Sequence, residues 1–147
     1  MSNFDQKIQE DITRFGCAVI HISEEDDLPP FSFSVGITKT AAAPELIVIG
    51  LQQELAHVLI NDFHERVGAG ESFRVGERYS GFLEEFDVAL ERVAESFYDE
   101  YLGYNLGFYK GPNFEALQLI YPNTEGIWPW QPEADACYRA RQPLLQE

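Results

Sequence analysis

The chain has few cysteines and no long apolar run, and each deficit excludes a class of protein. Two cysteines, Cys17 and Cys137, among 147 residues are too few and too far apart for a disulfide framework or a zinc site. No apolar stretch approaches the ~20 residues that span a bilayer. The first residues carry neither the basic nor the apolar part of a secretory signal. We therefore expect free thiols, no metal site and a cytoplasmic protein.

Positive charge is scarce as well. Ten Lys and Arg residues face 25 Asp and Glu residues, which gives a formal net charge of −15. Such a field repels phosphate backbones and anionic lipid headgroups, so we expect neither nucleic acid nor membrane as a partner. The same field speeds the encounter with a basic protein, although an acidic surface can also serve solubility alone.

Catalytic motifs are missing too. The sequence contains no G-x-G-x-x-G, no Walker-type lysine and no G-x-S-x-G elbow. His57 and His64 lie one heptad apart on a predicted helix, about 10 Å along its axis, which is too far to share one metal ion. Cys17 and His21 share a strand face, but no third residue orients them as a nucleophilic pair. The sequence predicts no catalytic residue and no cofactor. This favours a non-enzyme and leaves an enzyme open.

The clearest fold signal lies in residues 30–51. Residues 31–38 alternate Phe, Val and Ile with Ser, Gly and Thr, the pattern of a half-buried strand. Residues 46–49 read Leu-Ile-Val-Ile, which predicts a strand covered on both faces. Gly50 then makes a strand-to-helix turn. A sheet with helices packed on it follows from these two runs.

The remaining elements complete a single domain over residues 1–147. Apolar residues at helical spacing predict helices, and shorter apolar runs between turn residues predict strands. The predicted apolar face of the second helix consists of Leu55, Val58, Leu59, Phe63 and Val67. The predicted helices cover residues 3–15, 53–67 and 95–110, and the further strands cover residues 17–22, 72–75, 82–93 and 114–121. We expect an α+β fold, with a mainly antiparallel sheet of about five strands and about three helices.

Aromatic residues gather in the last third of the chain. A stripe at helical spacing can be core, the wall of a pocket, or a contact patch. The residues after Gly126, which include a Trp-Pro-Trp turn, are apolar enough that we expect them to dock on the domain. The stripe consists of Phe97, Tyr101, Tyr104 and Phe108.

Three motifs resemble a bacterial family, the domain of unknown function 4262. The first, P-x-F-x-[YF]-[ST]-V-G, is matched by Pro30, Phe31 and residues 33–36, and the second, P-E-L-[IV]-[IV]-x-G-L, by residues 44–51. The third is similar to Q-x-[IV]-[WY]-P-D-x-x-G-x-[FW]-P-W and begins at Gln118, but Asn123 stands where the motif has aspartate. Any role of that carboxylate in cation binding or proton transfer is therefore in doubt here. The resemblance implies a shared fold and supplies no reaction.

Two functional hypotheses follow from the residues. The first is a non-catalytic protein-binding protein, for example an immunity-type inhibitor whose acidic face neutralises a basic toxin or enzyme. Its candidate contact residues are Glu24, Glu25, Asp26, Asp27, Glu84, Glu85 and Asp99.

The second hypothesis is a small-molecule or cofactor-binding domain, with modest enzymatic activity as an option. Hydroxyls of the central strand, a lysine and backbone amides after Gly50 would hold a small anion between aromatic walls. Its candidate pocket residues are Ser32, Ser34, Lys39, Asn61, Tyr104 and Trp128. The first hypothesis is the one the acidic composition favours.

Overall fold

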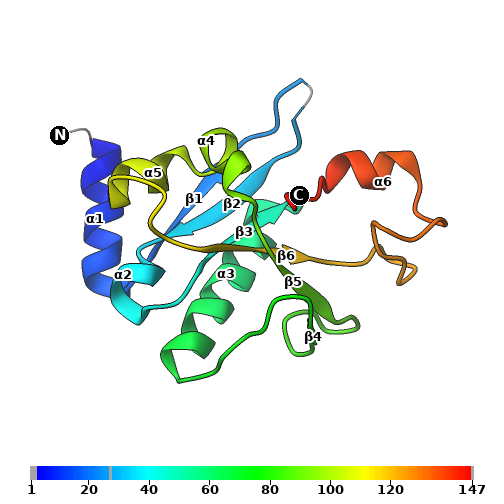
Figure 1. Cartoon of the computed structure of the whole chain (residues 1–147), viewed down its shortest axis with the longest axis horizontal. Coiled ribbons are helices and arrows are strands. Elements are labelled where there is room, and N and C mark those ends of the chain that lie inside the picture. Colours follow the sequence, from blue (N-terminus) through cyan, green and yellow to red (C-terminus); the bar gives the residue numbers. More distant parts are fainter. Residues whose placement is uncertain (1–2, 27, 147) are drawn as a thin grey trace.

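A computed structural model describes residues 3–26 and 28–146 (Figure 1). The strands are β1 (Ala18–Ile22), β2 (Phe31–Val35), β3 (Glu45–Ile49), β4 (Arg78–Tyr79), β5 (Val88–Arg92) and β6 (Ala116–Ile120). The helices are α1 (Asn3–Phe15), α2 (Ile37–Ala41), α3 (Gln53–Gly68), η1 (Glu95–Phe97), α4 (Tyr98–Tyr101), α5 (Gly103–Tyr109) and α6 (Ala136–Arg141). None of the described helices has the length and apolar character needed to cross a membrane.

In the described chain, the strands form one sheet in the order β1-β2-β3-β6-β5-β4. All neighbours are antiparallel except β3 and β6, which run parallel with Glu45 opposite Ala116. The predicted α+β class with a mainly antiparallel sheet is confirmed. The described chain has six strands where about five were expected. It has six α-helices and one 3₁₀ helix where about three helices were expected, because α2 and α6 were not predicted and the segment 95–110 is divided into three pieces.

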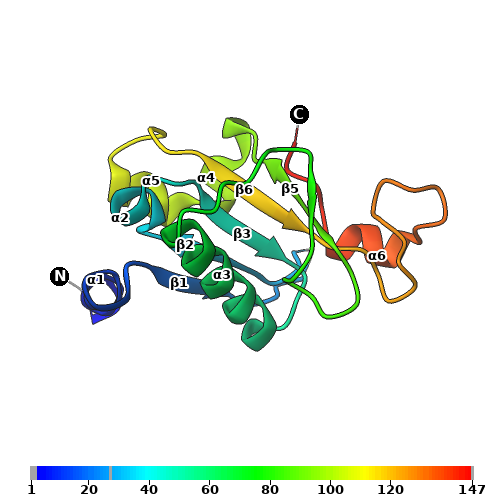
Figure 2. The same cartoon turned by 90° about the horizontal axis from the view of Figure 1, so that it is seen from below.

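Helices cover both faces of the sheet (Figure 2). α1, α4 and α5 pack on one face, where Ile47 and Ile49 of β3 point, and α3 packs on the other, where Leu46 and Val48 point. Each of these four side chains is fully buried. The prediction of a central strand covered on both faces is therefore confirmed, and this double cover explains its unbroken apolar sequence.

The C-terminal end of β2 differs from the predicted strand. The strand stops at Val35, all five of its residues are buried, and Gly36 takes a φ of +104° before the short helix α2 begins. The serines that suggested a wet face are buried because their hydroxyls find partners inside the protein. The expected half-buried strand to Thr38 was wrong for this reason.

The orientation of α3 was also mispredicted. Leu55 and Val58 are 40% and 61% exposed, whereas the side of α3 that includes Ala56 and Ile60 is buried. A buried face of Ala56, Leu59, Ile60 and Phe63 keeps helical spacing and rotates the helix away from the stripe predicted by large residues alone. The predicted bounds of the helix agree with the structure to within one residue.

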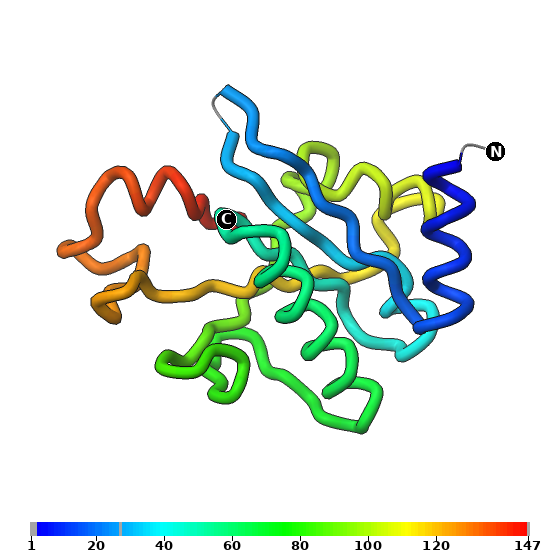
Figure 3. Tube along the Cα trace, turned by 180° about the vertical axis from the view of Figure 1, so that it is seen from behind, coloured from blue at the N-terminus to red at the C-terminus, as the bar shows by residue number. Residues whose placement is uncertain are grey.

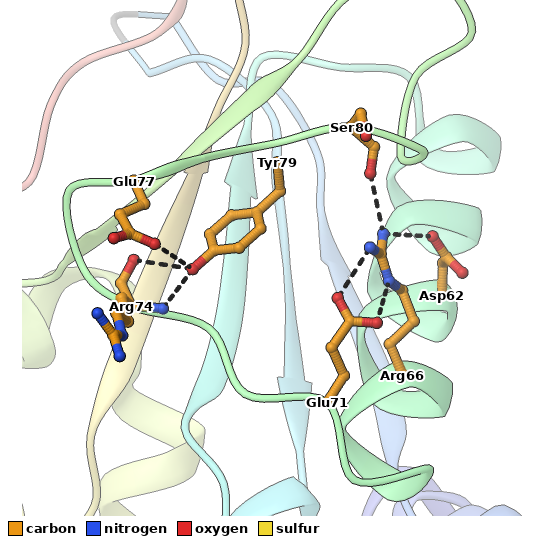
Figure 4. A network of polar contacts seen from close by, with 7 residues as sticks. All are labelled: Asp62, Arg66, Glu71, Arg74, Glu77, Tyr79 and Ser80. Atoms are coloured by element: carbon orange, nitrogen blue, oxygen red, sulfur yellow. Dashed lines mark hydrogen bonds and ion pairs between the residues drawn. The ribbon is translucent and has the colours of Figure 1, made fainter.

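The segment between α3 and β5 is irregular, although strands were predicted over residues 72–75 and 82–93. Arg66 holds this segment to α3 through two hydrogen bonds to Glu71, of 3.1 and 2.9 Å, and one to the carbonyl of Ser80 at 3.4 Å (Figure 4). Its guanidinium also lies 4.2 Å from the centre of the Phe82 ring. Side-chain contacts with a helix thus replace sheet pairing here, and only Val88–Arg92 forms the longer strand.

The aromatic segment 95–110 is three short helical pieces rather than one helix, with a break at Leu102. Tyr101 is buried, and Phe97, Tyr104 and Phe108 pack against the same core cluster. The core interpretation of the aromatic stripe is confirmed. The C-terminal segment docks as expected, since Trp128, Gln142 and Leu145 are buried. α6 was not predicted.

Gly50 is the point where the sheet meets the C-terminal segment. Its amide donates to the carbonyl of Pro30 at 2.8 Å, and its carbonyl accepts from the Arg141 side chain at 2.8 Å. A Cβ at this position would lie 2.5 Å from the Arg141 carbonyl oxygen and 2.6 Å from the Tyr121 hydroxyl, and the φ is +90°. Only glycine fits both restrictions.

We predict that Gly50→Ala lowers the free energy of unfolding by at least about 2 kcal/mol, because backbone strain and a steric clash act together. Gly68→Ala is the matched control: it lies in α3 with no atom within 4 Å of the added Cβ. It should leave stability unchanged or raise it by up to about 1 kcal/mol. Urea unfolding of both variants measures the difference, and equal stabilities would contradict this interpretation of Gly50.

Candidate functional site

Ser34, a residue of the predicted pocket, is committed to a buried carboxylate. Its hydroxyl donates to Glu45 Oε1 at 2.6 Å and accepts from the amide of Leu46 at 2.9 Å. The other oxygen of Glu45 accepts from the amides of Gly36 and Thr38 at 3.2 and 3.1 Å and from the hydroxyl of Tyr109. The Ser34 hydroxyl, which was predicted to hold a small anion, and the neighbouring amides thus hold the protein's own carboxylate.

The environment of Glu45 affects the ionisation of its carboxyl group in two opposing ways. Burial raises the pKa of Glu45 above its ordinary value, while hydrogen bonds from Ser34, Tyr109 and two backbone amides stabilise the charged form. Burial and the adjacent carboxylate raise the pKa of Tyr109. The hydroxyl of Tyr109 therefore stays protonated and acts as a donor to Glu45.

The other pocket candidates lie apart from Ser34 and from one another. Lys39 is exposed and lies over the ring of Phe108, 5.7 Å from its centre. Tyr104 donates to Asp5 at 2.9 Å, a part-buried contact that joins α5 to α1. Trp128 stacks on Trp130 beside the far ends of β5 and β6. The structure does not bring the six residues together in one cavity.

The acidic candidates are also dispersed. Glu24, Glu25 and Asp26 are exposed at the end of the β1–β2 hairpin, and Glu84 and Glu85 are exposed in the loop before β5. Figure 1 shows these two segments on opposite sides of the sheet, with Asp99 in α4 as a third location. Asp27 lies outside the described residues. The acidic candidates therefore lie on at least two sides of the sheet and do not form one face.

A concave site lies elsewhere, along the outer side of β1. α1 and α3 form its walls and β1 its floor, and the cavity has a volume of about 580 Å³. We call it the edge groove. The α3 wall and the floor differ in character: the wall is mostly polar and the floor is apolar, while the α1 wall combines Lys7 and Asp11 with the apolar Phe15. The residues that line it include Lys7, Asp11, Cys17, Val19, His57, Asn61, His64 and Glu65.

All three histidines of the chain lie at or beside the edge groove. His21 Nδ1 is 2.6 Å from the hydroxyl of Ser32, and His21 Nε2 is 3.2 Å from His57 Nδ1. The ring centres of His21 and His57 are 5.4 Å apart with nearly parallel planes. The gap between the two nitrogens is much shorter than that between the ring centres, so the nitrogens point at each other in a hydrogen bond.

The contacts of Ser32 and His57 favour one tautomer of His21. We assign the Ser32 hydroxyl as the donor to Nδ1, because within the described chain this buried O–H contacts no other acceptor and an unpaired buried donor is costly. His21 Nε2–H then donates to His57 Nδ1. Two protonated rings would place N–H groups against each other, so the pair can hold one added proton at most. Burial is the main cause that lowers the pKa of His21, and the charge of His57 lowers it further.

The potential nucleophiles near the groove are held in inactive forms. Cys17 is 4% exposed, and burial together with the charges of Glu45 and Asp11 raises the pKa of its thiol to about 12. Ser32 is 2% exposed at the inner end of the histidine pair. No group of three or more His, Cys, Asp or Glu side chains in residues 3–26 and 28–146 is arranged to hold a metal ion. Sequence reasoning missed the His21–His57 contact because it joins a strand to a helix far along the chain.

Asn123, which replaces an aspartate of the family motif, has a structural role here. Its side-chain oxygen accepts from the amides of Glu125 and Ile127 at 2.9 and 3.0 Å, which closes the turn after β6. A carboxylate oxygen can accept the same two bonds. The replacement therefore preserves the turn.

We predict that Glu45→Ala lowers the free energy of unfolding by at least about 3 kcal/mol, because several buried donors lose their acceptor at once. Glu115→Ala is the matched control, since its ion pair with Arg92 at 3.3 Å is 60% exposed on both sides. Glu115→Ala should lower the free energy of unfolding by less than about 1 kcal/mol. Denaturant unfolding measures the free energy of unfolding of both variants. A small loss of stability in Glu45→Ala would contradict the prediction that the surrounding donors depend on this carboxylate.

We predict that His21 titrates below its ordinary value of 6.5. The unfolded chain then binds the proton more readily, so the contribution of His21 to stability is full above pH 6.5 and declines as the pH falls below it. His57→Gln removes the neighbouring charge and leaves the burial, so the pKa of His21 should rise and stay below 6.5. NMR titration of the ring protons measures it. His64→Gln should leave His21 unchanged, and a wild-type value of 6.5 or above would contradict the prediction.

Comparison with known proteins gives one positive result. A family model, Domain of unknown function (DUF4262), matches residues 11–135. No curated protein and no solved structure shows significant similarity to the chain. The matched segment contains all six strands and helices α2 to α5. Because the match covers most of the 147 residues, the protein belongs to the DUF4262 family.

Proposed function

We propose that the protein is a non-catalytic protein-binding protein, an inhibitor of the immunity type that holds a basic toxin or enzyme. The observation that carries the proposal is the edge groove, an open site of about 580 Å³ between α1 and α3. A preformed concave surface on rigid elements binds a partner with little ordering cost. The proposal moves the contact surface from the acidic loops to this groove.

The charges of the groove support a basic partner. Lys7, the lysine of the α1 wall, lies 2.9 Å from Asp11 and is neutralised by it. Glu65 on the α3 wall forms no ion pair among the described residues, and Glu54 lies near enough to His21 to affect its pKa. The groove thus has an excess of negative charge within a chain of net charge −15.

The dispersed acidic loops support the same proposal in another way. Carboxylates spread over several sides of a molecule raise the association rate with a basic partner from many directions, without contributing contacts in the complex. The states of Cys17 and Ser32 support a non-catalytic role, since neither nucleophile is exposed or ionised. Two free cysteines also fit the reducing cytoplasm in which we place the protein.

We predict that the tagged protein captures one stoichiometric basic protein from its native cell at low salt and less of it at high salt. Asn61→Arg should reduce capture at least about tenfold, because it places a bulky positive charge in the groove. Val58→Arg is the matched control, with the same charge on the same helix outside the groove, and should retain capture. Mass spectrometry identifies and quantifies the partner.

Two results would overturn the proposal. One is that no basic protein is captured at either salt concentration. The other is that Asn61→Arg and Val58→Arg reduce capture equally, since the partner would then respond to total charge rather than to the groove.

A further inference from the structure

The two edges of the sheet are built differently. β4 forms one edge, is two residues long, and places the charged Arg78 there. β1 forms the other edge over five residues, Ala-Val-Ile-His-Ile, without lysine, proline or a break in its pairing with β2. Proteins usually protect an edge strand by shortness, charge, proline or a bulge, and only β4 shows such protection.

The outer side of β1 has no backbone partner in the described chain. The backbone hydrogen bonds outside helices and sheets include none from residues 17–22. α1 and α3 flank the strand without pairing with it, and the floor of the edge groove consists of residues 17–19. Figure 3 shows the rest of β1 continuing past the helices into the projecting hairpin. Main-chain donors and acceptors are thus available beside a preformed cavity.

We infer that the edge groove binds an extended segment of the basic partner as a seventh strand alongside β1. This inference rests on the proposed function and specifies how the partner is held. In this mode, main-chain hydrogen bonds provide affinity and alternate side chains provide specificity.

The walls determine the side chains that fit. Val19 and His21 point toward α3, where Asn61, His64 and Glu65 line the groove, so every second residue of the segment would meet polar and acidic groups. Ala18 and Ile20 point toward the α1 side, where Phe15 would give the intervening residues an apolar contact beside the Lys7–Asp11 pair. The groove therefore fits a segment that alternates cationic with β-branched residues.

Charge excludes a second copy of the chain as the occupant. Pairing two β1 edges would bring together two molecules of net charge −15, with the Glu65 carboxylates of both grooves near one another. Like charges in such proximity oppose association. A basic segment instead neutralises Glu65, which forms no ion pair among the described residues.

The titratable groups around the groove give the site a pH dependence. His21 on β1 contacts Ser32 of β2 and His57 of α3, with Glu54 nearby on α3. The other titratable groups of the groove are Lys7, Asp11, Cys17, His64 and Glu65. A proton added to the histidine pair places positive charge next to the bound cationic residues, so binding should weaken as the pH falls through the lowered pKa of His21.

The test uses the full chain and a defined probe, the peptide acetyl-Val-Lys-Val-Lys-Val-amide. Titration calorimetry should show saturable binding. The peptide should slow NMR amide exchange at alternate residues of β1 by about tenfold or more, because those amides become hydrogen-bonded. The amides of Arg78 and Tyr79, on the other edge, should not change. A peptide N-methylated at alternate residues keeps the charges and removes donors, and it should not bind. Glutamate in place of lysine should also abolish binding.

The outcomes separate the binding mode from the proposed function. Equal binding by the N-methylated peptide, slowed exchange on β4 rather than β1, or no binding of the unmodified peptide would each overturn strand addition. A basic protein still captured in an Asn61-dependent way would then leave the proposed function standing. Slowed exchange in β1 without capture of any basic protein would support the edge site and refute the proposed function.

Discussion

Burial of the Glu45 carboxylate organises the end of the sheet at which β2, α2, β3 and α5 meet. A fully buried carboxylate is tolerated only when donors surround it, and here they come from Ser34, Gly36, Thr38 and Tyr109. The positions of these donors determine where β2 ends, where α2 begins and how α5 lies against the sheet. The position of α1 follows, since Ile12 packs against Gly36.

Elements specified by local pattern could be predicted from the sequence. The positions of α1, β1, β3 and α3 follow from apolar patterns in their own residues, although the buried face of α3 was mispredicted. Gly16 ends α1 with a φ of +93°. Elements specified by distant contacts could not be predicted. α2 depends on Glu45, and the segment after α3 depends on Arg66, so neither pattern is visible within a window of neighbouring residues.

The same distinction between local patterns and distant contacts applies to the candidate site. The acidic composition could be read from the sequence, but the distribution of its carboxylates around the molecule could not. The shared face of His57, Asn61 and His64 was visible as helical spacing, whereas the contact of His57 with His21 requires α3 to lie beside β1. The exposed edge itself depends on strand order, which one sequence does not determine.

The parallel pairing of β3 with β6 also has a kinetic consequence. β1, β2 and β3 are neighbours in sequence and in the sheet, so they can associate through contacts of short range. β6 reaches the centre of the sheet only after a long intervening segment has been ordered, because Glu45 pairs with Ala116. Closing so large a loop makes the middle of the sheet its slowest part to assemble, with β3 exposed on one side until β6 arrives.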